Sequence, residues 1–353
     1  MKILKFLFLS IFFVALYSCS SSEDNGGPAV EVTSITITPS MATQTVGVPT
    51  TFTVKTEANL DVTATSVISV VGVNAPLTNA SFSPNAAGIY TVKANYSGKT
   101  ASTTVTYVDG PSTSFVKRVL IEDYTGTWCG FCPRVAQGID LVMSQTDYAV
   151  PVAIHRSGGG AQTDPYHFAA ASPLLSLIGL TGYPDARLNR ITKWSGDEAT
   201  NSGQVISFTQ GTAPKVGLAM KATVANGTVN LTVKTQFGKN MTGTKLVVYA
   251  LENGLIYDQV NYTSHYGGGS TIVGFQHNHV LRATYTNILG DEIPAGESVY
   301  ENTYTKTYSL PVPANVTNAS KMEFVAFVVG SDNKAMNVRK AVSGDDQTFE
   351  IVE

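Results

Sequence analysis

The sequence predicts a multidomain, mostly β protein in which one α/β segment lies between two all-β regions. Apolar and polar residues alternate in short runs over residues 29–108 and again over residues 213–353. Residues 113–212 instead contain a β-branched run followed by apolar residues at helical spacing. With 353 residues, 43% hydrophobic and 14% charged, the chain has enough apolar material for two or three cores, which excludes a disordered protein.

The N-terminus has the features of an export signal. Residues 6–16 are almost wholly apolar but too short for the roughly 20 residues of a membrane-spanning helix, so residues 1–18 are predicted to be a signal peptide. Leu16-Tyr17-Ser18-Cys19 resembles a bacterial lipobox, which implies cleavage before Cys19 and a lipid anchor on that residue. The alternative is an ordinary signal peptide that ends near a cysteine. Polar residues 19–28 would then be a flexible tether. Its acidic residues resemble the surface-export signals of lipoproteins in some Gram-negative bacteria, which implies exposure at the cell surface.

Charge and glycine pattern exclude several classes of ligand. The net charge is −3 and no basic stripe is present, so nucleic acid is not expected as a partner. Gly158, Gly159 and Gly160 are not followed by the Lys-Ser/Thr pair of a phosphate-binding loop. We therefore predict no cofactor and no metal ion, and membrane attachment through Cys19 only.

The first all-β region, residues 29–108, is predicted to be an immunoglobulin-like sandwich. Six or seven short alternating runs separated by turn residues are typical of that fold, and four of them are Val32–Thr38, Thr51–Thr56, Ile89–Ala94 and Ala101–Tyr107. The region contains no catalytic set of residues, so a spacer or a binding module is the expected role. Residues 109–112 (DGPS) are predicted to be the linker that follows.

The cysteines point to redox chemistry. Besides Cys19 the chain has only Cys129 and Cys132, in Trp128-Cys129-Gly130-Phe131-Cys132-Pro133. A zinc site needs four ligands, and the chain has no second CxxC. A disulfide across so short a loop contributes little as a structural staple. A redox pair is therefore the leading interpretation, and an inert relic of such a pair is the main alternative.

The local pattern predicts which cysteine reacts. Residues 116–123 are expected to form a buried strand and residues 135–143 a helix, so Cys129 would lie at a helix N-terminus. Backbone N–H groups there would stabilise its thiolate and lower its pKa from about 8.5 to below about 7.5. Cys132 would be the more buried, resolving thiol. Trp128 and Phe131 are expected to form an apolar docking rim, with ordinary packing around the turn as the alternative.

The run V-L-I-E-D-Y-T-G-T-W-C-G-F-C resembles that of thioredoxin-fold domains. The resemblance implies a proton-relay role for Asp123, six residues before Cys129; its neighbour Glu122, on the other face of the strand, is the alternative buried carboxylate. It also implies a cis-proline loop opposite the cysteines. Thr181-Gly182-Tyr183-Pro184 fits that place, with Pro184 as the cis residue and Tyr183 offering its backbone to a substrate.

The rest of the α/β segment is less regular. Residues 148–155 are expected to form the next strand, and residues 156–167 a Gly-rich insertion. A helix over residues 168–180 interrupted by Pro173, and another over residues 197–208, would complete the domain. His155 would end its strand near the cysteine pair, either tuning the thiolate or serving as a satisfied loop residue.

Residues 213–353 are predicted to form a second sandwich. The runs Leu246–Leu251 and Phe324–Val329 have the composition of central strands, and Asn226-Gly227 marks a hairpin. His277 and His279 are expected on one strand face, where the alternatives are a metal site and a surface feature.

Phe275-Gln276-His277-Asn278-His279-Val280-Leu281-Arg282, together with the C-G-x-C-P motif, resembles the twenty-eight-kilodalton outer-membrane protein family. The resemblance covers about residues 115–353 and implies an outer-membrane lipoprotein with a thioredoxin-like core. Thiol–disulfide exchange on exported proteins or peptides is the expected activity. The alternative is a surface binding or adhesin-like lipoprotein whose cysteine pair is not catalytic. The sequence does not distinguish oxidase, reductase and isomerase.

Overall fold

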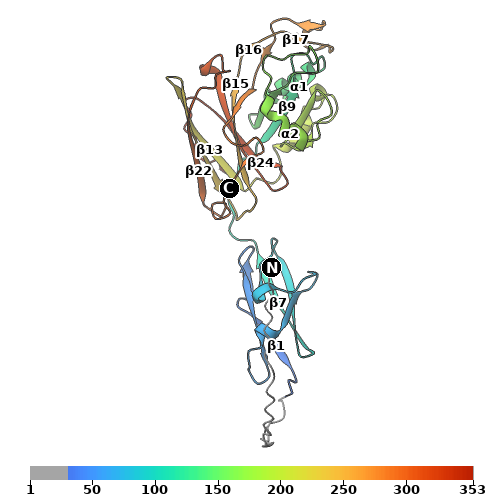
Figure 1. Cartoon of the computed structure of the whole chain (residues 1–353), viewed down its shortest axis with the longest axis vertical. Coiled ribbons are helices and arrows are strands. Elements are labelled where there is room, and N and C mark those ends of the chain that lie inside the picture. Colours follow the sequence, from blue (N-terminus) through green and yellow to red (C-terminus); the bar gives the residue numbers. More distant parts are fainter. Residues whose placement is uncertain (1–30, 353) are drawn as a thin grey trace, which may run out of the picture. The chain divides into compact units, whose positions relative to one another are not determined.

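A computed structural model describes residues 31–352, which divide into two compact units, residues 31–108 and residues 109–352. The predicted signal peptide, Cys19 and the tether lie outside the described residues. Figure 1 shows that strands predominate and helices are few, in agreement with the predicted β-rich protein. None of the helices in the described part combines the length and the apolar character that crossing a bilayer requires.

The first unit consists of two sheets packed around one apolar core. One sheet has the order β1-β3-β5 and the other the order β2-β7-β6-β4. Alternating residues of both sheets, among them Phe52, Val54, Val92 and Val105, point inward and are almost fully buried. The strands are β1 (Ile35–Pro39), β2 (Thr43–Thr45), β3 (Thr50–Thr56), β4 (Val67–Val70), β5 (Ser81–Phe82), β6 (Gly88–Tyr96) and β7 (Lys99–Val108), with 3-10 turns η1 (Thr63–Thr65) and η2 (Thr78–Ala80).

The second unit is built on a nine-stranded mixed sheet. Its order is β12-β11-β9-β10-β20-β15-β23-β24, with β21 paired to β15. Its strands are β9 (Val119–Thr125), β10 (Ala149–His155), β11 (Asp185–Leu188), β12 (Thr192–Lys193), β15 (Lys245–Glu252), β20 (Val280–Thr284), β21 (Asp291–Glu292), β23 (Met322–Val329) and β24 (Ala335–Val342). The central positions predicted for residues 246–251 and 324–329 are confirmed, since β15 and β23 pair directly with each other.

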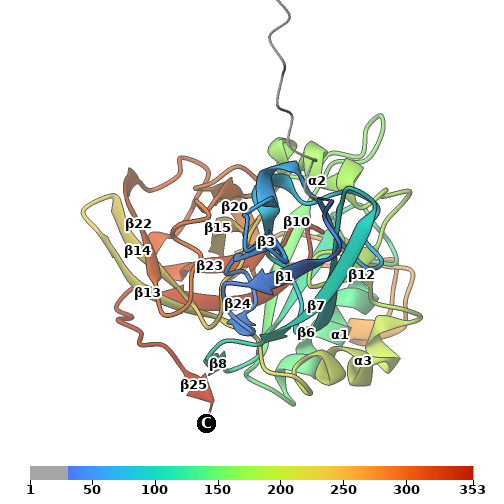
Figure 2. The ribbon, with the colours of Figure 1, turned by 90° about the horizontal axis from the view of Figure 1, so that it is seen from below.

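Three layers cover this sheet. The helices are α1 (Pro133–Met143), α2 (Ser172–Leu177) and α3 (Ser202–Phe208), with 3-10 turns η3 (Ala169–Ala171) and η4 (Glu198–Thr200). On one face α1 and α3 pack over β9, β10 and β11, and a three-stranded sheet of β13 (Val216–Ala225), β14 (Thr228–Phe237) and β22 (Thr303–Pro311) packs over β15 and β23. The opposite face packs against α2. Figures 1 and 2 show α1 and the three-stranded sheet at opposite ends of the unit.

The sheet crosses the expected boundary between residues 212 and 213. Strand β10 pairs with β20 in parallel, so strands from 113–212 and from 213–353 form one continuous hydrogen-bonded layer. The three-stranded sheet also has no core of its own, because its inward residues pack on β15 and β23. The structure therefore differs from the predicted division: residues 109–353 are one compact unit.

The predicted helices are present but shorter at two places. Residues 168–180 contain η3 followed by α2, and Pro173 lies in the first turn of α2, where its missing N–H leaves no helical hydrogen bond unmade. The predicted interruption by Pro173 is therefore a helix start. Residues 197–208 likewise divide into η4 and α3.

Residues 255–279 form a separate layer of short pieces, here called the covering segment. It contains β16 (Leu255–Ile256), β17 (Gln259–Val260), η5 (His265–Gly267), β18 (Thr271–Ile272) and β19 (Gln276–His277). β16 pairs with β19 and β17 pairs with β18. The remaining strands, β8 (Ser114–Phe115) and β25 (Ile351–Val352), pair with each other, and η6 (Ala319–Lys321) precedes β23.

Candidate functional site: a covered disulfide beside a cavity

Cys129 and Cys132 form a disulfide at the start of α1. The helix begins at Pro133 with Cys132 as its N-cap, so Cys129 lies one turn before the helix. The expected position of Cys129 at the helix N-terminus is therefore wrong by one turn. Proline at the first helical position explains where the helix begins, since its fixed φ suits a first turn.

Both cysteines are buried, and Cys132, expected to be the more buried of the two, is so by a small margin. Cys129 is 4% exposed and Cys132 2%. Phe131, between them, is 50% exposed, as a docking rim requires. Trp128 packs edge-on against Tyr183 with ring centroids 5.5 Å apart, and its Nε1 donates to the carbonyl of Arg156.

The covering segment buries Cys129. The Gln259 side-chain amide donates to the carbonyls of Gly126 and Cys129, at 3.2 and 2.9 Å. The backbone N–H of Val260 donates to Thr127, and that of Tyr262 donates to Gly130. The Tyr262 ring packs edge-on against Phe131, at 5.6 Å between centroids. These contacts come from a region about 130 residues further along the chain. The covering segment contains no sequence motif that predicts contacts with the disulfide loop.

Gly130 is needed for this contact. A Cβ atom on residue 130 would overlap the Tyr262 ring. Glycine between the cysteines therefore allows the covering segment to approach the disulfide loop closely.

Asp123 and Glu122 lie on opposite faces of β9, and both are buried. Asp123 points to the side of α1 and lines a cavity together with Cys132. Its Oδ1 has no hydrogen-bond partner within the described residues. Burial, with Glu198 and Asp185 nearby, raises the pKa of Asp123 well above its usual value. Glu122 faces the other way.

Glu122 belongs to a core network on the α2 side. It lies 3.5 Å from Arg190 and accepts hydrogen bonds from the hydroxyls of Tyr124 and Tyr249, at 3.1 and 3.4 Å. These partners leave it no access to the disulfide side. Of the two carboxylates considered for a proton relay, only Asp123 shares a cavity with a cysteine.

The peptide bond between Tyr183 and Pro184 is cis, as expected. Strand β11 begins with the next residue and pairs with β9, Asp185 opposite Tyr124. This pairing sets the Tyr183–Pro184 loop next to the turn that leads into the disulfide. The edge-on contact between Trp128 and Tyr183 also connects this loop to the turn before Cys129.

His155 ends β10 and lines the same cavity as Cys132. Its Nδ1 lies 2.9 Å from Asp164 Oδ2, and both side chains are buried. Asp164 also accepts from the backbone N–H of Thr127, at 2.7 Å. Although its burial opposes ionisation, the hydrogen bond and charge of His155 lower the pKa of Asp164 overall.

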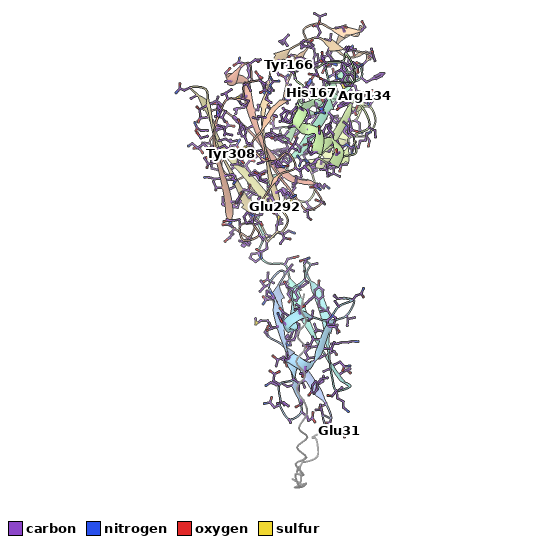
Figure 3. The ribbon with its side chains drawn as sticks, viewed as in Figure 1. Glu31, Arg134, Tyr166, His167, Glu292 and Tyr308 are labelled. Atoms are coloured by element: carbon purple, nitrogen blue, oxygen red, sulfur yellow. A yellow bond between two sulfur atoms is a disulfide. The ribbon has the colours of Figure 1, made fainter. Side chains whose placement is uncertain are left out.

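Asp164 was not predicted as a site residue. It lies in the insertion 156–167, where nothing but the turn pattern was visible in sequence. Figure 3 labels Tyr166 and His167 of this insertion, and Arg134 of α1, at the end of the unit that holds the disulfide. Arg134 pairs with the buried Glu198 at 2.7 Å, which ties α1 to η4.

His277 and His279 also line the cavity, but not as a pair on one strand. His277 ends β19, and His279 has a φ of +56°, which breaks the strand between them. Burial, with His155 nearby, lowers the pKa of His277 to about 3, so the ring is neutral. His279 Nδ1 lies 2.8 Å from Glu323. Within residues 31–352 no group of His, Cys, Asp and Glu has the arrangement of a metal site.

The cavity itself has a volume of about 420 Å³. α1, β9, β10 and the covering segment form its walls. It combines apolar side chains such as Ile139, Met143 and Phe275 with Asp123, Asp140 and the three histidines. This mixture and this volume are typical of small-molecule sites, and the cavity lies next to the disulfide.

The fold and site define a β-rich protein with a covered disulfide beside a small cavity. Residues 171–347, half of the chain, match the family described as outer membrane protein Omp28, and the chain belongs to this family. This membership makes it an envelope protein of the outer-membrane class. No curated protein matches the sequence significantly.

Two solved structures are similar. HBP35 of Porphyromonas gingivalis aligns with a TM-score of 0.52 at 19% identity, over 68% of this chain and 81% of that one. At this identity the likeness shows a shared fold alone. A protein of Agrobacterium tumefaciens aligns with a TM-score of 0.41 at 13% identity, over 66% of this chain and 96% of that one, and carries no argument.

Proposed function

We propose that this outer-membrane-family protein performs thiol–disulfide exchange through a thioredoxin-like domain with Cys129 and Cys132 as its redox pair. One observation carries the proposal. Cys132 shares a cavity with Asp123, a buried carboxyl whose Oδ1 has no partner in the described chain. An unpaired buried carboxyl costs stability, and a proton-transfer role beside a sulfur would account for keeping it.

The roles follow from the positions. Cys129 attacks a partner disulfide, and Cys132 resolves the mixed disulfide. Asp123, held protonated by its raised pKa, donates its proton to the Cys132 sulfur when that sulfur leaves as a thiolate and recovers it when Cys132 is oxidised again. The cis Pro184 loop, with Tyr183, supports a substrate strand beside the pair.

Partners and location complete the proposal. Exported proteins or peptides would dock on the rim of Trp128, Phe131 and Tyr183, of which Phe131 is half exposed. The protein would be attached to the outer membrane through a lipid on Cys19 and would face the cell surface, as the acidic tether favours. The first unit, proposed as an immunoglobulin-like module, would be the spacer between the tether and the redox domain in the chain.

A second candidate rests on the covering segment. Because Gln259, Val260 and Tyr262 are hydrogen-bonded to the disulfide loop, a folded partner cannot reach Cys129 unless this segment moves. This observation favours a surface binding or adhesin-like lipoprotein in which the disulfide is permanently closed. The two candidates differ in one measurable property, the exchange activity of the pair.

The test is a redox titration of the mature protein against dithiothreitol buffers, followed by insulin reduction. A redox protein is expected to equilibrate within minutes and to lose turnover in Cys129→Ser and Cys132→Ser. Asp123→Asn should slow turnover by about tenfold or more, while Asp147→Asn, an exposed aspartate after α1, should not. A pair that stays oxidised in the native protein and is reduced only after unfolding would establish the binding candidate instead.

A further inference from the structure

The cavity meets the disulfide at one cysteine only. Cys132 lines it and Cys129 does not. Cys129 is closed off by the turn 126–130 and by Gln259 and Tyr262 of the covering segment. A nucleophile attacks a disulfide along the S–S axis, from the side of the attacked sulfur that faces away from the other. In this conformation the side that a small molecule can reach is therefore that of Cys132.

The cavity is too small for a folded protein and large enough for a metabolite-sized molecule. Its volume of about 420 Å³ lies near the lower end of the roughly 300–1,000 Å³ usual for small-molecule sites. Protein strands from an external partner would have to displace the covering segment, whereas a small thiol would not.

We propose that the cavity between α1, β10 and the covering segment admits a low-molecular-weight thiol that reduces the Cys129–Cys132 disulfide by attack at Cys132. The inference rests on the redox function proposed above and names its reductant class. It also reverses the expected order of the two cysteines when the disulfide is reduced. Cys132, assigned above as the resolving thiol, is the one that the small thiol attacks first.

The walls favour a thiol that is uncharged or positively charged. Asp123 and Asp140 both line the cavity, and no lysine or arginine is among the described residues that do so. Asp123 is 4% exposed, and its Oδ1 lacks any partner in the described chain, so a donor group on the thiol would satisfy it. The Tyr266 hydroxyl donates to Asp140 at 2.9 Å and stabilises the negative charge of that wall. Asp123 is held protonated and adds no charge, so an anionic thiol would meet the charge of Asp140 with no lysine or arginine on the walls to offset it.

The chemistry balances with two equivalents of thiol. The first thiolate forms a bond to the Cys132 sulfur, the S–S bond breaks, and its electron pair leaves on the Cys129 sulfur, which takes up a proton. A second thiolate attacks the external sulfur of this mixed disulfide, releasing the small disulfide and Cys132 as a thiolate. Asp123 is placed to protonate that thiolate. The net result is one protein dithiol and one small-molecule disulfide.

The first test maps the attacked sulfur. Oxidised full-length mature protein is mixed with 2-mercaptoethanol and excess iodoacetamide, quenched in acid, digested and measured by mass spectrometry. The expected product carries mercaptoethanol on Cys132 and the alkyl group on Cys129, in an excess of about fivefold or more over the reverse product. A majority of mercaptoethanol on Cys129 would overturn the inference.

The second test narrows the cavity. Ala136 of α1 lines it, and Ala136→Phe should slow reduction by 2-mercaptoethanol about tenfold. Gln137→Phe is the matched control, on the same helix but away from the cavity, and should change the rate less than about twofold. Equal rates in the two variants would count against the cavity as the entrance. The mapping experiment needs no variant, so it remains decisive if Ala136→Phe fails to fold.

The third test uses thiols of similar size and different charge. Cysteamine, 2-mercaptoethanol and 3-mercaptopropionate are compared, each rate being divided by the rate of the same thiol with hydroxyethyl disulfide. The corrected rates should fall in that order, by about tenfold from first to last. The reverse order would refute the charge argument. If dithiothreitol in excess leaves the native disulfide intact, the redox function itself fails, whereas reduction with attack at Cys129 removes only this inference.

Discussion

The side-chain amide of Gln259 donates a hydrogen bond of 2.9 Å to the carbonyl oxygen of Cys129, 130 positions earlier in the chain. The same amide donates to Gly126, and the neighbouring N–H of Val260 donates to Thr127. Four carbonyl oxygens of the disulfide loop therefore accept hydrogen bonds from the covering segment, those of Gly126, Thr127, Cys129 and Gly130. Opening the site requires breaking these bonds together, which makes the covering segment the element that controls access to Cys129.

Gly130→Ala should loosen the covering segment. The added methyl group overlaps the Tyr262 ring, so the ring and the segment behind it must move. We expect reduction of the disulfide by a protein dithiol, which must displace the covering segment to reach Cys129, to become about three- to tenfold faster, because access to that cysteine limits the rate. The measurement is a quenched thiol assay of Cys129 and Cys132.

Gly182→Ala is the control for that substitution. It lies in the loop before Pro184, and a Cβ there would meet nothing within 4 Å. An equal acceleration in both variants would mean that glycine replacement acts through general loosening and not through Tyr262. No acceleration in Gly130→Ala would mean that the segment already opens faster than the disulfide reacts.

Asp123→Asn should stabilise the second unit at neutral pH. Burial raises the pKa of Asp123 in the folded protein above its unfolded value. The folded state therefore holds a proton that the unfolded state loses, so this group costs stability increasingly as pH rises above about 4. We expect the variant to gain on the order of 1 kcal/mol at pH 7 and little at pH 4.

Urea unfolding at the two pH values, followed by circular dichroism, measures that difference. Asp147→Asn serves as the exposed control and should move neither value. A variant that is equally destabilised at both pH values would show that Asp123 makes a hydrogen bond the structure does not contain. Lower exchange activity together with higher stability is the combination that a functional, strained carboxyl predicts.

His277 should make the protein sensitive to acid. Its folded pKa is lowered to about 3 by burial and by His155, whereas an unfolded histidine titrates near 6.5. Below about pH 6.5 the unfolded state binds a proton that the folded state does not, so stability falls with a slope of up to about 1.4 kcal/mol per pH unit. His277→Gln should flatten this slope, and His265→Gln in η5 should not.

Thermal or urea unfolding from pH 7 to pH 4 measures how steeply stability depends on pH in each variant. Only this slope is compared, because His277 also packs against Phe275 and Tyr166 and its removal costs stability at every pH. A parallel loss for both variants over that range would place the acid-sensitive group elsewhere. The Asp164–His155 pair does not confuse the sign, since a carboxyl with a lowered pKa loses stability only as pH falls through its own, more acidic range.

Local patterns predicted the strand-helix elements around the cysteines correctly. β9, α1 and β10 lie where the β-branched runs and the helical spacing place them, because their apolar faces are buried by neighbours close in sequence. Strand β9 is buried on both faces, so Glu122 and Asp123 are both buried, on opposite sides of the sheet. This is why the sequence alone left both carboxylates as candidates for the proton relay.

The long-range contacts around the disulfide could not be predicted from the sequence. Gln259, Tyr262 and Asp164 have ordinary polar or aromatic neighbours in the chain, and their role arises only when residues 255–279 and 156–167 fold over the disulfide loop. The sheet that crosses residues 212 and 213 was missed for the same reason. Alternation shows that a strand is half buried, but not that β10 finds its partner in β20.

The buried pair Glu122–Arg190 should connect the two halves of the sheet energetically. Arg190, fully buried after β11, donates to Tyr249 of β15 at 2.7 Å and lies 4.8 Å above the Phe327 ring of β23, while Glu122 comes from β9. Arg190→Met leaves the Glu122 carboxylate buried without a cation, which typically costs about 3–5 kcal/mol. Because the loss comes from the orphaned charge, Glu122→Gln combined with Arg190→Met should recover most of it. Lys193→Met, which removes a largely exposed partner of Asp185, should cost less than about 1 kcal/mol. Urea unfolding of the unchanged protein, Glu122→Gln, Arg190→Met and the double variant gives the coupling energy. A double variant as unstable as the sum of the two single variants would show that the pair does not act as a unit.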